Sequence, residues 1–286
     1  MMNFGEIPRE YADYSTSPIV IFPVAYDKTS TWIKGSDKGP QAILDASANM
    51  ELYDIDTDSE VYRLGIHTAE IMRSENSPEK LTGEVYEKVR KYAGDEKFVV
   101  TLGGNHTVSI GAIRAFAGKY NDLTVLQFDA HADLRQEYED SPYNHACVMA
   151  RARELCSVLQ VGIRSMSVEE KEFMDPERTV FAGEILDSTK WEQKVLNNLT
   201  KNVYITIDLD VFDPAIMPST GTPEPGGLRY DQVLNMIRKV IVRSNVVAFD
   251  VVELCPNERN KAPDFLAAKL LYQILSERFK NRIPEH

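Results

Sequence analysis

Six apolar runs rich in β-branched residues constrain this chain more than any other feature, because each has the length of one strand. Several of them are apolar on both faces, which is expected when helices cover both sides of a parallel sheet. The sequence therefore predicts an α/β fold built on a parallel sheet. The runs occupy residues 18–24, 97–102, 123–129, 157–163, 203–212 and 246–254.

The stretches between these runs show helical periodicity. Ser77 and Pro78 suit the N-cap and the first position of a helix. No tract of Gly, Ser or Pro is long enough to be a linker and no internal repeat is present, so we predict a single domain over residues 1–286. The apolar positions that share a helical face are Leu81, Val85, Val89 and Tyr92; Val233, Met236, Ile237, Val240 and Ile241; and Phe265, Leu266, Leu270, Ile274 and Leu275.

The charge balance restricts the class of partner. The net charge is −12, with 44 acidic and 32 basic residues, which argues against nucleic acid or an anionic membrane surface and is compatible with a cationic small molecule. The sequence contains no stretch of about 18 uncharged apolar residues and no N-terminal signal pattern. We therefore expect a cytoplasmic protein.

The three cysteines, Cys147, Cys156 and Cys255, are an odd number without CxxC spacing. They support neither a disulfide framework nor a thiolate zinc site. Cys147 stands two residues from His145 and could be reactive, but we interpret it as a buried apolar thiol and assign it no role.

Acidic side chains gather at the ends of two runs. Asp129, His131 and Asp133 alternate after the third run, and Asp208 and Asp210 alternate in the fifth. On a strand, alternate residues point to the same face. Neighbouring buried carboxylates would repel one another and resist ionisation unless a divalent cation compensates them.

A third strand end adds His106, the last residue of the turn "GGNH" after the second run. An oxygen-rich set with some imidazole suits Mn²⁺ or a related ion better than a soft metal. Six ligands exceed the number that one catalytic metal usually takes, so two ions roughly 3.5–4 Å apart would account for them. The candidate ligands are His106, Asp129, His131, Asp133, Asp208 and Asp210.

Each piece also has an ordinary structural explanation. A lone DxD at a strand end commonly anchors a loop, and the glycines of "GGNH" could simply permit a tight turn. The GxGxxG spacing of a dinucleotide site is absent. The coincidence of three such segments in one chain is what favours the metal site.

These segments, with those that follow them, resemble one family. The stretches "GGNH", "DAHADLRQEYEDSPYNHA", "DLDVFDPAIMPSTGTPEPGG" and "DVVEL", in this order over about residues 100–260, resemble the ureohydrolases, which include arginase and agmatinase. The stretch "PVAYDKTSTWIKGSDKGPQAIL" is a weaker match. The resemblance implies a three-layer α/β/α sandwich with a mainly parallel central sheet, of the arginase/deacetylase type. It also implies a homo-oligomer, a trimer or hexamer.

The resemblance further implies two Mn²⁺ ions, although other divalent metals could replace them. Asp129 and Asp208 would bridge the two ions. One ion would be bound by His106, Asp129, Asp133 and Asp208, and the other by Asp129, His131, Asp208 and Asp210.

A mechanism comes with this resemblance. Two cations lower the pKa of a bridging water, and the resulting hydroxide attacks the guanidinium carbon, so that the tetrahedral intermediate collapses to urea and an amine. Asp133 would accept the proton and pass it to the leaving nitrogen. Glu253 would pair with the substrate guanidinium, unless it is a strand-end carboxylate bonded to local backbone. His145 would contact substrate and assist proton transfer, unless it is a surface histidine.

Two residues depart from the family pattern. Asn105 stands where the family more often has Asp, so a negative partner of the metal site would be neutral here and metal affinity or choice could change. Ser219 stands where Gly is common, which could alter the backbone of its loop.

The segment "LRQEYEDSPYN" bears on the substrate. It carries Glu137, Glu139 and Asp140 and resembles agmatinases rather than arginases, which use a segment rich in Ser and Asn to hold an α-carboxylate and α-amine. We therefore predict hydrolysis of the guanidino group of agmatine to putrescine and urea. The alternatives are N1-aminopropylagmatine, guanidinobutyrate or arginine as substrate, or a metal-binding relative that does not catalyse hydrolysis.

Overall fold

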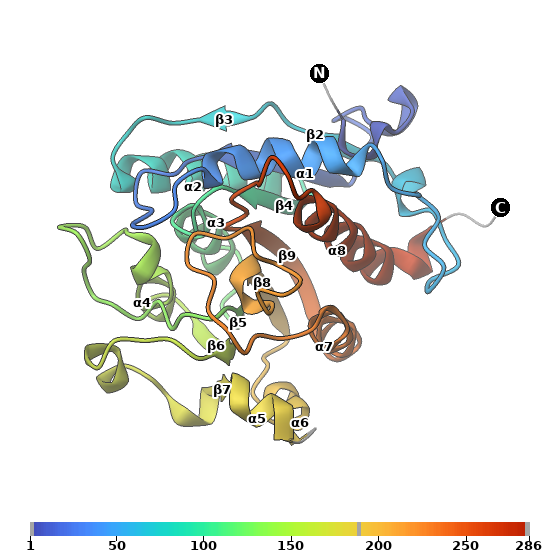
Figure 1. Ribbon diagram of the computed structural model, residues 1–286. Coiled ribbons are helices and arrows are strands. Elements are labelled where there is room, and N and C mark those ends of the chain that lie inside the picture. Colours follow the sequence, from blue (N-terminus) through green and yellow to red (C-terminus); the bar gives the residue numbers. More distant parts are fainter. Residues whose placement is uncertain (1–2, 188–189, 284–286) are drawn as a thin grey trace.

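The computed structural model describes residues 3–187 and 190–283 and contains a central sheet between two layers of helices (Figure 1). The nine strands of the described sheet pair in parallel, in the order β2-β1-β4-β9-β8-β5-β6-β7, with β3 paired to β1. The strands are β1 (Ile19–Ala25), β2 (Ile66–Thr68), β3 (Met72–Arg73), β4 (Phe98–Gly103), β5 (Leu123–Phe128), β6 (Ser157–Ile163), β7 (Thr179–Phe181), β8 (Asn202–Asp208) and β9 (Asn245–Val252).

Helices cover both faces of the sheet, and Figure 1 shows α7 and α8 on one side and α3 and α4 on the other. One apolar cluster packs beneath α1 (Gly39–Ser47), α5 (Ala182–Asp187), α6 (Lys190–Asn197), α7 (Tyr230–Arg243) and α8 (Ala262–Phe279). The other packs beneath α2 (Pro78–Gly94), α3 (Val108–Ala117) and α4 (Val148–Arg153). The predicted α/β/α sandwich with a parallel sheet is confirmed.

Strand β8 shows why the apolar runs are continuous. Val203, Ile205 and Ile207 belong to the first apolar cluster, whereas Tyr204 belongs to the second. A strand that packs against helices on both faces needs apolar side chains at successive positions. At α2, the Ser77 hydroxyl accepts a hydrogen bond from the N–H of Lys80, which confirms the predicted cap.

Two predicted strand ends differ from the structure. The run 203–212 leaves the sheet at Asp208, because the Asp208 carboxylate accepts the N–H of Asp210 at 2.9 Å and begins a 3₁₀ turn at Leu209–Val211. Asp129, His131 and Asp133 likewise follow the end of β5 rather than continue it. Strict alternation on a strand was therefore the wrong geometric reason for their proximity.

Strands β4, β5 and β8 precede the candidate ligands, and β9 precedes Glu253. These four strands are neighbours in the sheet, in the order β4, β9, β8, β5. Because they are parallel, their carboxyl ends meet at one edge, where open α/β sheets commonly form sites. No helix of residues 3–187 and 190–283 is long and apolar enough to cross a membrane. The division into one domain stays a prediction, although one sheet unites strands from Ile19 to Val252.

All three cysteines are free. Cys147 is buried, whereas Cys156 and Cys255 are half-buried. Burial raises the pKa of its thiol to about 12, so the group remains protonated near neutral pH. This agrees with the interpretation of Cys147 as an inert thiol.

Candidate active site

All six candidate ligands converge at the carboxyl ends of β4, β5 and β8. Their ligand atoms fall into two overlapping groups, within each of which the atoms lie no more than 4.8 Å apart. Asp129 belongs to both groups, and Asp133 lies beside the first, with its Oδ2 3.0 Å from Nδ1 of His106. The groups are His106, Asp129 and Asp208, and Asp129, His131 and Asp210. Each group could hold a metal ion.

The backbone is held in an unusual conformation at two of the acidic residues. Asp133 has a φ of 53° and Glu253 a φ of 66°, a left-handed conformation that side chains other than Gly rarely adopt. The carbonyl of Asp133 accepts the N–H groups of Met149 and Ala150, and the N–H of Glu253 donates to the carbonyl of Gly104 at 2.7 Å. The surrounding structure therefore maintains the strain, as is common at functional sites.

His106 is oriented by a chain of hydrogen bonds that crosses from β8 to β9. Thr206 donates to Asp250 Oδ1 at 2.6 Å, and Tyr204 donates to Asp250 Oδ2 at 2.6 Å. Since its own proton is committed, Thr206 accepts from Nε2 of His106, 2.9 Å away. In the neutral ring this leaves a lone pair on Nδ1, which is buried without a hydrogen-bond partner.

The surroundings of that lone pair fit a cation. Nδ1 of His106 lies 3.3 Å from Asp129 Oδ2, 3.0 Å from Asp133 Oδ2 and 3.5 Å from Asp208 Oδ2. Burial opposes protonation of the ring, but Asp129 and Asp133 outweigh it and raise the pKa of His106 well above its usual range. A metal ion among these four acceptors would take the place of that proton.

The Thr206 hydroxyl is therefore expected to support metal binding. In Thr206→Val, Nε2 of His106 loses its acceptor, and divalent metal affinity measured by calorimetry should fall about 10–100-fold. Thr124→Val is the matched control, because Thr124 is equally buried in β5 but bonds to Thr200, 2.8 Å away and remote from the site. Equal metal affinity in both variants would contradict an orienting role for Thr206.

Three acidic residues of the site, Asp133, Asp208 and Glu253, resist ionisation. Burial, followed by the charge of Asp129, raises the pKa of Asp133 to about 7. Burial raises the pKa of Glu253 to about 8 and, with Asp210 and Asp129, raises that of Asp208 well above its usual range. Burial also acts on Asp129, but His106 and His131 reverse its effect and hold the pKa of Asp129 below its usual range. The donor set thus has the excess of carboxylates that a divalent cation compensates.

His145 lies beside this cluster, on the loop after β5. The Asn144 side chain accepts the N–H of Ala146 and begins a 3₁₀ turn at His145–Cys147. The ring of His145 packs edge-on against Tyr138, and its Nδ1 is buried without a hydrogen-bond partner. Burial, then the neighbouring histidines, lowers the pKa of His145 to about 4. His145 is half-buried rather than fully exposed, and its role stays a prediction.

Glu253 has one oxygen engaged and the other directed to a cavity. Its Oε1 accepts the N–H of His106 at 2.6 Å, a backbone group 147 residues away in the sequence, and the role of Glu253 in substrate binding stays a prediction. The cavity is about 30 Å³ and also borders His106, Asp133 and Asp208. A Cβ placed on Gly221, which lines it, would stand 3.9 Å from Oε2 of Glu253.

A second cavity of about 260 Å³ adjoins the first. Thr31, His131, Asp133, His145 and Thr222 border both. The acidic loop residues Glu137, Glu139 and Asp140 are exposed and border neither.

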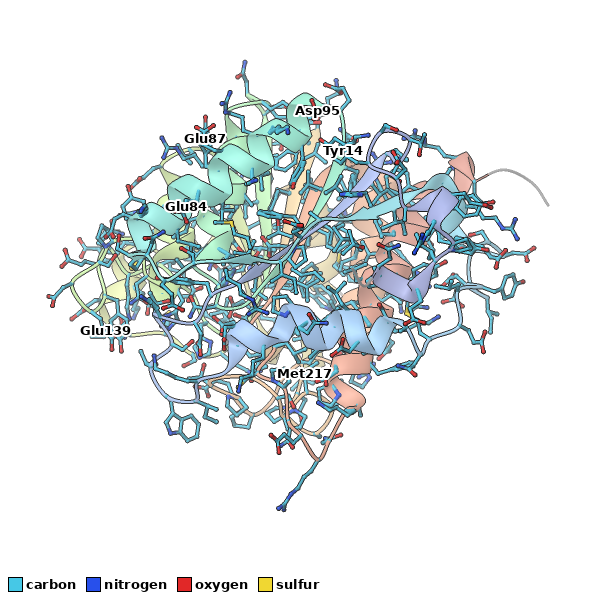
Figure 2. All side chains as sticks on the ribbon, turned by 90° about the horizontal axis from the view of Figure 1, so that it is seen from above. Tyr14, Glu84, Glu87, Asp95, Glu139 and Met217 are labelled. Carbon is cyan, nitrogen blue, oxygen red and sulfur yellow. The ribbon has the colours of Figure 1, made fainter. Side chains whose placement is uncertain are left out.

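Figure 2 shows Glu139 at the outer edge of the molecule. Charges in such a position can attract a cationic ligand without contacting it in the site.

The two departures from the family pattern, Asn105 and Ser219, differ in their hydrogen bonding. The Asn105 side chain accepts from Thr29 at 2.6 Å and donates to Ser30 at 3.1 Å, so it uses both amide atoms to tie the turn after β4 to the loop after β1. An ionised Asp could not donate the second bond, and the Ser30 hydroxyl already donates to Asp27. Ser219 has no positive φ, and its carbonyl accepts the N–H of Cys255 at 2.8 Å, but its hydroxyl is buried without a hydrogen-bond partner among the described residues.

Several supporting residues were not identified from the sequence. Thr206 lies two residues before Asp208, but nothing in the sequence indicates its bond to His106. Gln127 donates to Asp129 Oδ2 at 2.7 Å and accepts from Gln160 at 2.6 Å, across the pairing of β5 with β6. Its position two residues before Asp129 was the only available signal.

Comparison with known proteins shows which family this sequence and fold are similar to. Residues 17–276 match the Arginase family. The N(1)-aminopropylagmatine ureohydrolase of Synechocystis is 36% identical, over 92% of this chain and 89% of that protein. The agmatinase of Pyrococcus horikoshii is 30% identical, over 94% of each chain. The crystal structure of the agmatine ureohydrolase of Thermoplasma volcanium superposes with a TM-score of 0.88 at 31% identity, covering 98% of this chain and 95% of that one.

Proposed function

The chain belongs to the arginase family and is a hydrolase acting on a guanidino C–N bond, and we propose that its substrate is agmatine, which it converts to putrescine and urea. The observation that supports this most is a small cavity with candidate metal ligands and the free oxygen of Glu253 on its walls. A guanidinium beside Glu253 would place its carbon next to the metal cluster.

Two divalent ions would be held by the two groups that share Asp129. Bound there, they would supply Lewis-acid activation of water. Carboxylate oxygens with two imidazole nitrogens favour Mn²⁺, our proposed metal. A bridging role for Asp208 remains a proposal, because Asp208 belongs to only one of the two groups.

Glu253 would bind and orient the guanidinium. Its Oε1 is held by the N–H of His106, so the carboxylate cannot rotate freely and Oε2 stays directed to the cavity. A guanidinium N–H donor to that oxygen makes a charge-assisted hydrogen bond. The arriving cation also favours the ionised form of Glu253, whose pKa burial raises to about 8.

Asp133 and His145 would move protons. A carboxyl group can accept a proton and then donate it, and Asp133 is positioned for this because it lies beside His106 at the cavity. His145 is held neutral by burial and has an unpartnered Nδ1, so it can accept a proton or contact a substrate N–H. The leaving amine would receive its proton from these groups.

N1-aminopropylagmatine is a second candidate substrate, for two reasons. Relatives bearing that activity in their names are 34–36% identical to this chain. The second cavity continues from the first and offers room for an additional aminopropyl group. A carboxylate-bearing substrate is less well supported. Arg135 borders this cavity and could pair with a carboxylate, but it already lies 3.9 Å from Glu170 and stacks on Tyr138.

A parallel assay distinguishes the candidates. The Mn²⁺-loaded protein is offered agmatine, N1-aminopropylagmatine, guanidinobutyrate and arginine, and kcat/KM for urea release is measured. We expect the highest value for agmatine. A higher value for aminopropylagmatine would replace the proposed substrate, and preference for guanidinobutyrate or arginine would overturn the assignment to an amine substrate. No urea from any of the four would favour a non-hydrolytic relative.

A further inference from the structure

The loop after β1 forms the outer wall of the first cavity. Thr31, Trp32 and Ile33 line it, as do Gly221 and Thr222. The carbonyl oxygen of Ile33 lies 3.4 Å from the position of a Cβ on Gly221, which itself is 3.9 Å from Oε2 of Glu253. The mouth of the cavity therefore lies close to the free oxygen of Glu253.

Both flanks of this loop are fixed by hydrogen bonds. Asp27 accepts from Ser30 and Ser36 and from the N–H of Gly35. Asn105 holds Thr29 and Ser30, and the thiol of Cys255 donates to the carbonyl of Lys34 at 3.3 Å. The short segment 31–33 is thus presented at the mouth by a braced loop.

Trp32 is unusually exposed within this braced loop. Its exposed fraction is 70%, and its side chain makes no hydrogen bond, ring contact or cation–π contact with residues 3–187 and 190–283. The indole is therefore available to a ligand at the mouth of the cavity.

The charges around the two cavities leave an ammonium group few partners. The carboxylates of the first cavity are those of the buried cluster, and its outer wall is uncharged. In the second cavity, Glu170 already accepts the N–H groups of Leu134 and Ser167 and lies 3.9 Å from Arg135. Arg135 in turn occupies the face of Tyr138, 4.6 Å from its centroid. No cation–π contact from residues 3–187 and 190–283 occupies the indole face of Trp32.

We propose, building on the function above, that the amine-bearing tail of the substrate lies against the indole of Trp32, which makes Trp32 a specificity-determining residue. The guanidinium sits at Glu253, and the alkyl chain leaves through the mouth past Ile33. The terminal ammonium then makes a cation–π contact with the indole, and the methylene groups pack on the same surface. Guanidines that end in a neutral group lose the electrostatic part of this contact.

Kinetics of Trp32 variants test the proposal. For agmatine, Trp32→Leu should raise KM about three- to tenfold with kcat within about twofold, because the contact is the same in ground and transition states. For pentylguanidine, in which a methyl group replaces the ammonium, Trp32→Leu should leave KM nearly unchanged. Trp32→Phe, which keeps an aromatic face, should recover most of the affinity for agmatine.

Fluorescence provides an independent measure of binding. The chain has two tryptophans, and the other, Trp191, is 5% exposed and packs in the core. In stopped-flow mixing of the Mn²⁺-loaded protein with agmatine, the indole emission should change before turnover in the wild type. The change should be absent in Trp32→Phe, which retains Trp191.

Each outcome bears on one proposal. An unchanged KM for agmatine in Trp32→Leu, in a protein that does release urea, would overturn the role of Trp32 and leave the proposed function intact. A changed oligomer mass in Trp32→Leu would place Trp32 in a subunit interface and also overturn it. Absence of urea from the wild type would overturn the proposed function, whereas an agmatine-dependent change in Trp32 emission would still support the subsite.

Discussion

Replacing Asp129 by Asn is expected to abolish urea release and to weaken divalent metal binding more than any other single substitution. Asp129 is shared by both ligand groups, so the change removes a negative charge from each of them. Its Oδ1 accepts the N–H of His131 at 2.6 Å and its Oδ2 accepts Gln127 at 2.7 Å. The amide nitrogen of Asn would face one of these donors, so the side chain could not keep its position.

Calorimetric titration with Mn²⁺ measures this effect. The loss of affinity should exceed the roughly 10–100-fold effect of removing an outer hydrogen-bond partner. Asp140→Asn is the matched control, because Asp140 is exposed on the loop after β5 and its positive φ suits Asn. If Asp129→Asn bound metal as tightly as the control, Asp129 would not be a shared ligand.

The Asp133→Asn variant is expected to lose catalysis far more than binding. Loss of a positioned proton acceptor lowers kcat by about 10²–10⁴-fold. Asn tolerates the left-handed backbone that Asp133 adopts, so the fold should survive the substitution. Because Asp133 lies beside the first ligand group rather than within it, metal affinity should fall less than in Asp129→Asn.

Urea release and metal titration on the same Asp133→Asn preparation separate these effects. Asp175→Asn provides a control, since the Asp175 side chain caps the short turn at Pro176–Arg178, outside both cavities. A kcat within about threefold of the wild type would exclude Asp133 as a proton carrier. Loss of metal equal to that in Asp129→Asn would instead make it primarily a ligand.

The fold followed from the sequence because burial on both faces leaves a clear pattern. All six apolar runs became strands, from β1 to β9. The short edge strands β2, β3 and β7 were missed, since two or three residues carry no periodicity. Helices such as α3 were also missed, because a helix that is buried nearly all round lacks a polar face.

The site was predicted more reliably than its local geometry. His106, Asp129 and Asp208 came together because parallel neighbouring strands end at one edge, not because alternate residues share a strand face. Asp208 ends its own strand by bonding to the N–H of Asp210, a local interaction that spacing does not reveal. The prediction of a trimer or hexamer in the cytoplasm stays a prediction.

Supporting contacts required the three-dimensional structure. Thr206 and Asp250 are register partners on β8 and β9, 44 residues apart in sequence, and only the sheet pairing brings them together. The exposure of Trp32 likewise could not be inferred, since an aromatic residue in a loop can be either buried or free. Such residues depend on strand order and loop packing rather than on a motif.

The most direct test of the account is ¹³C NMR of agmatine labelled at the guanidino carbon, incubated with the metal-stripped protein before and after addition of Mn²⁺. We expect the label to pass to urea, with an equal amount of putrescine, only after the metal is added. Label in N-carbamoylputrescine, with ammonia released, would mean that a different C–N bond is cleaved and would contradict the account. So would urea formation at the same rate without metal.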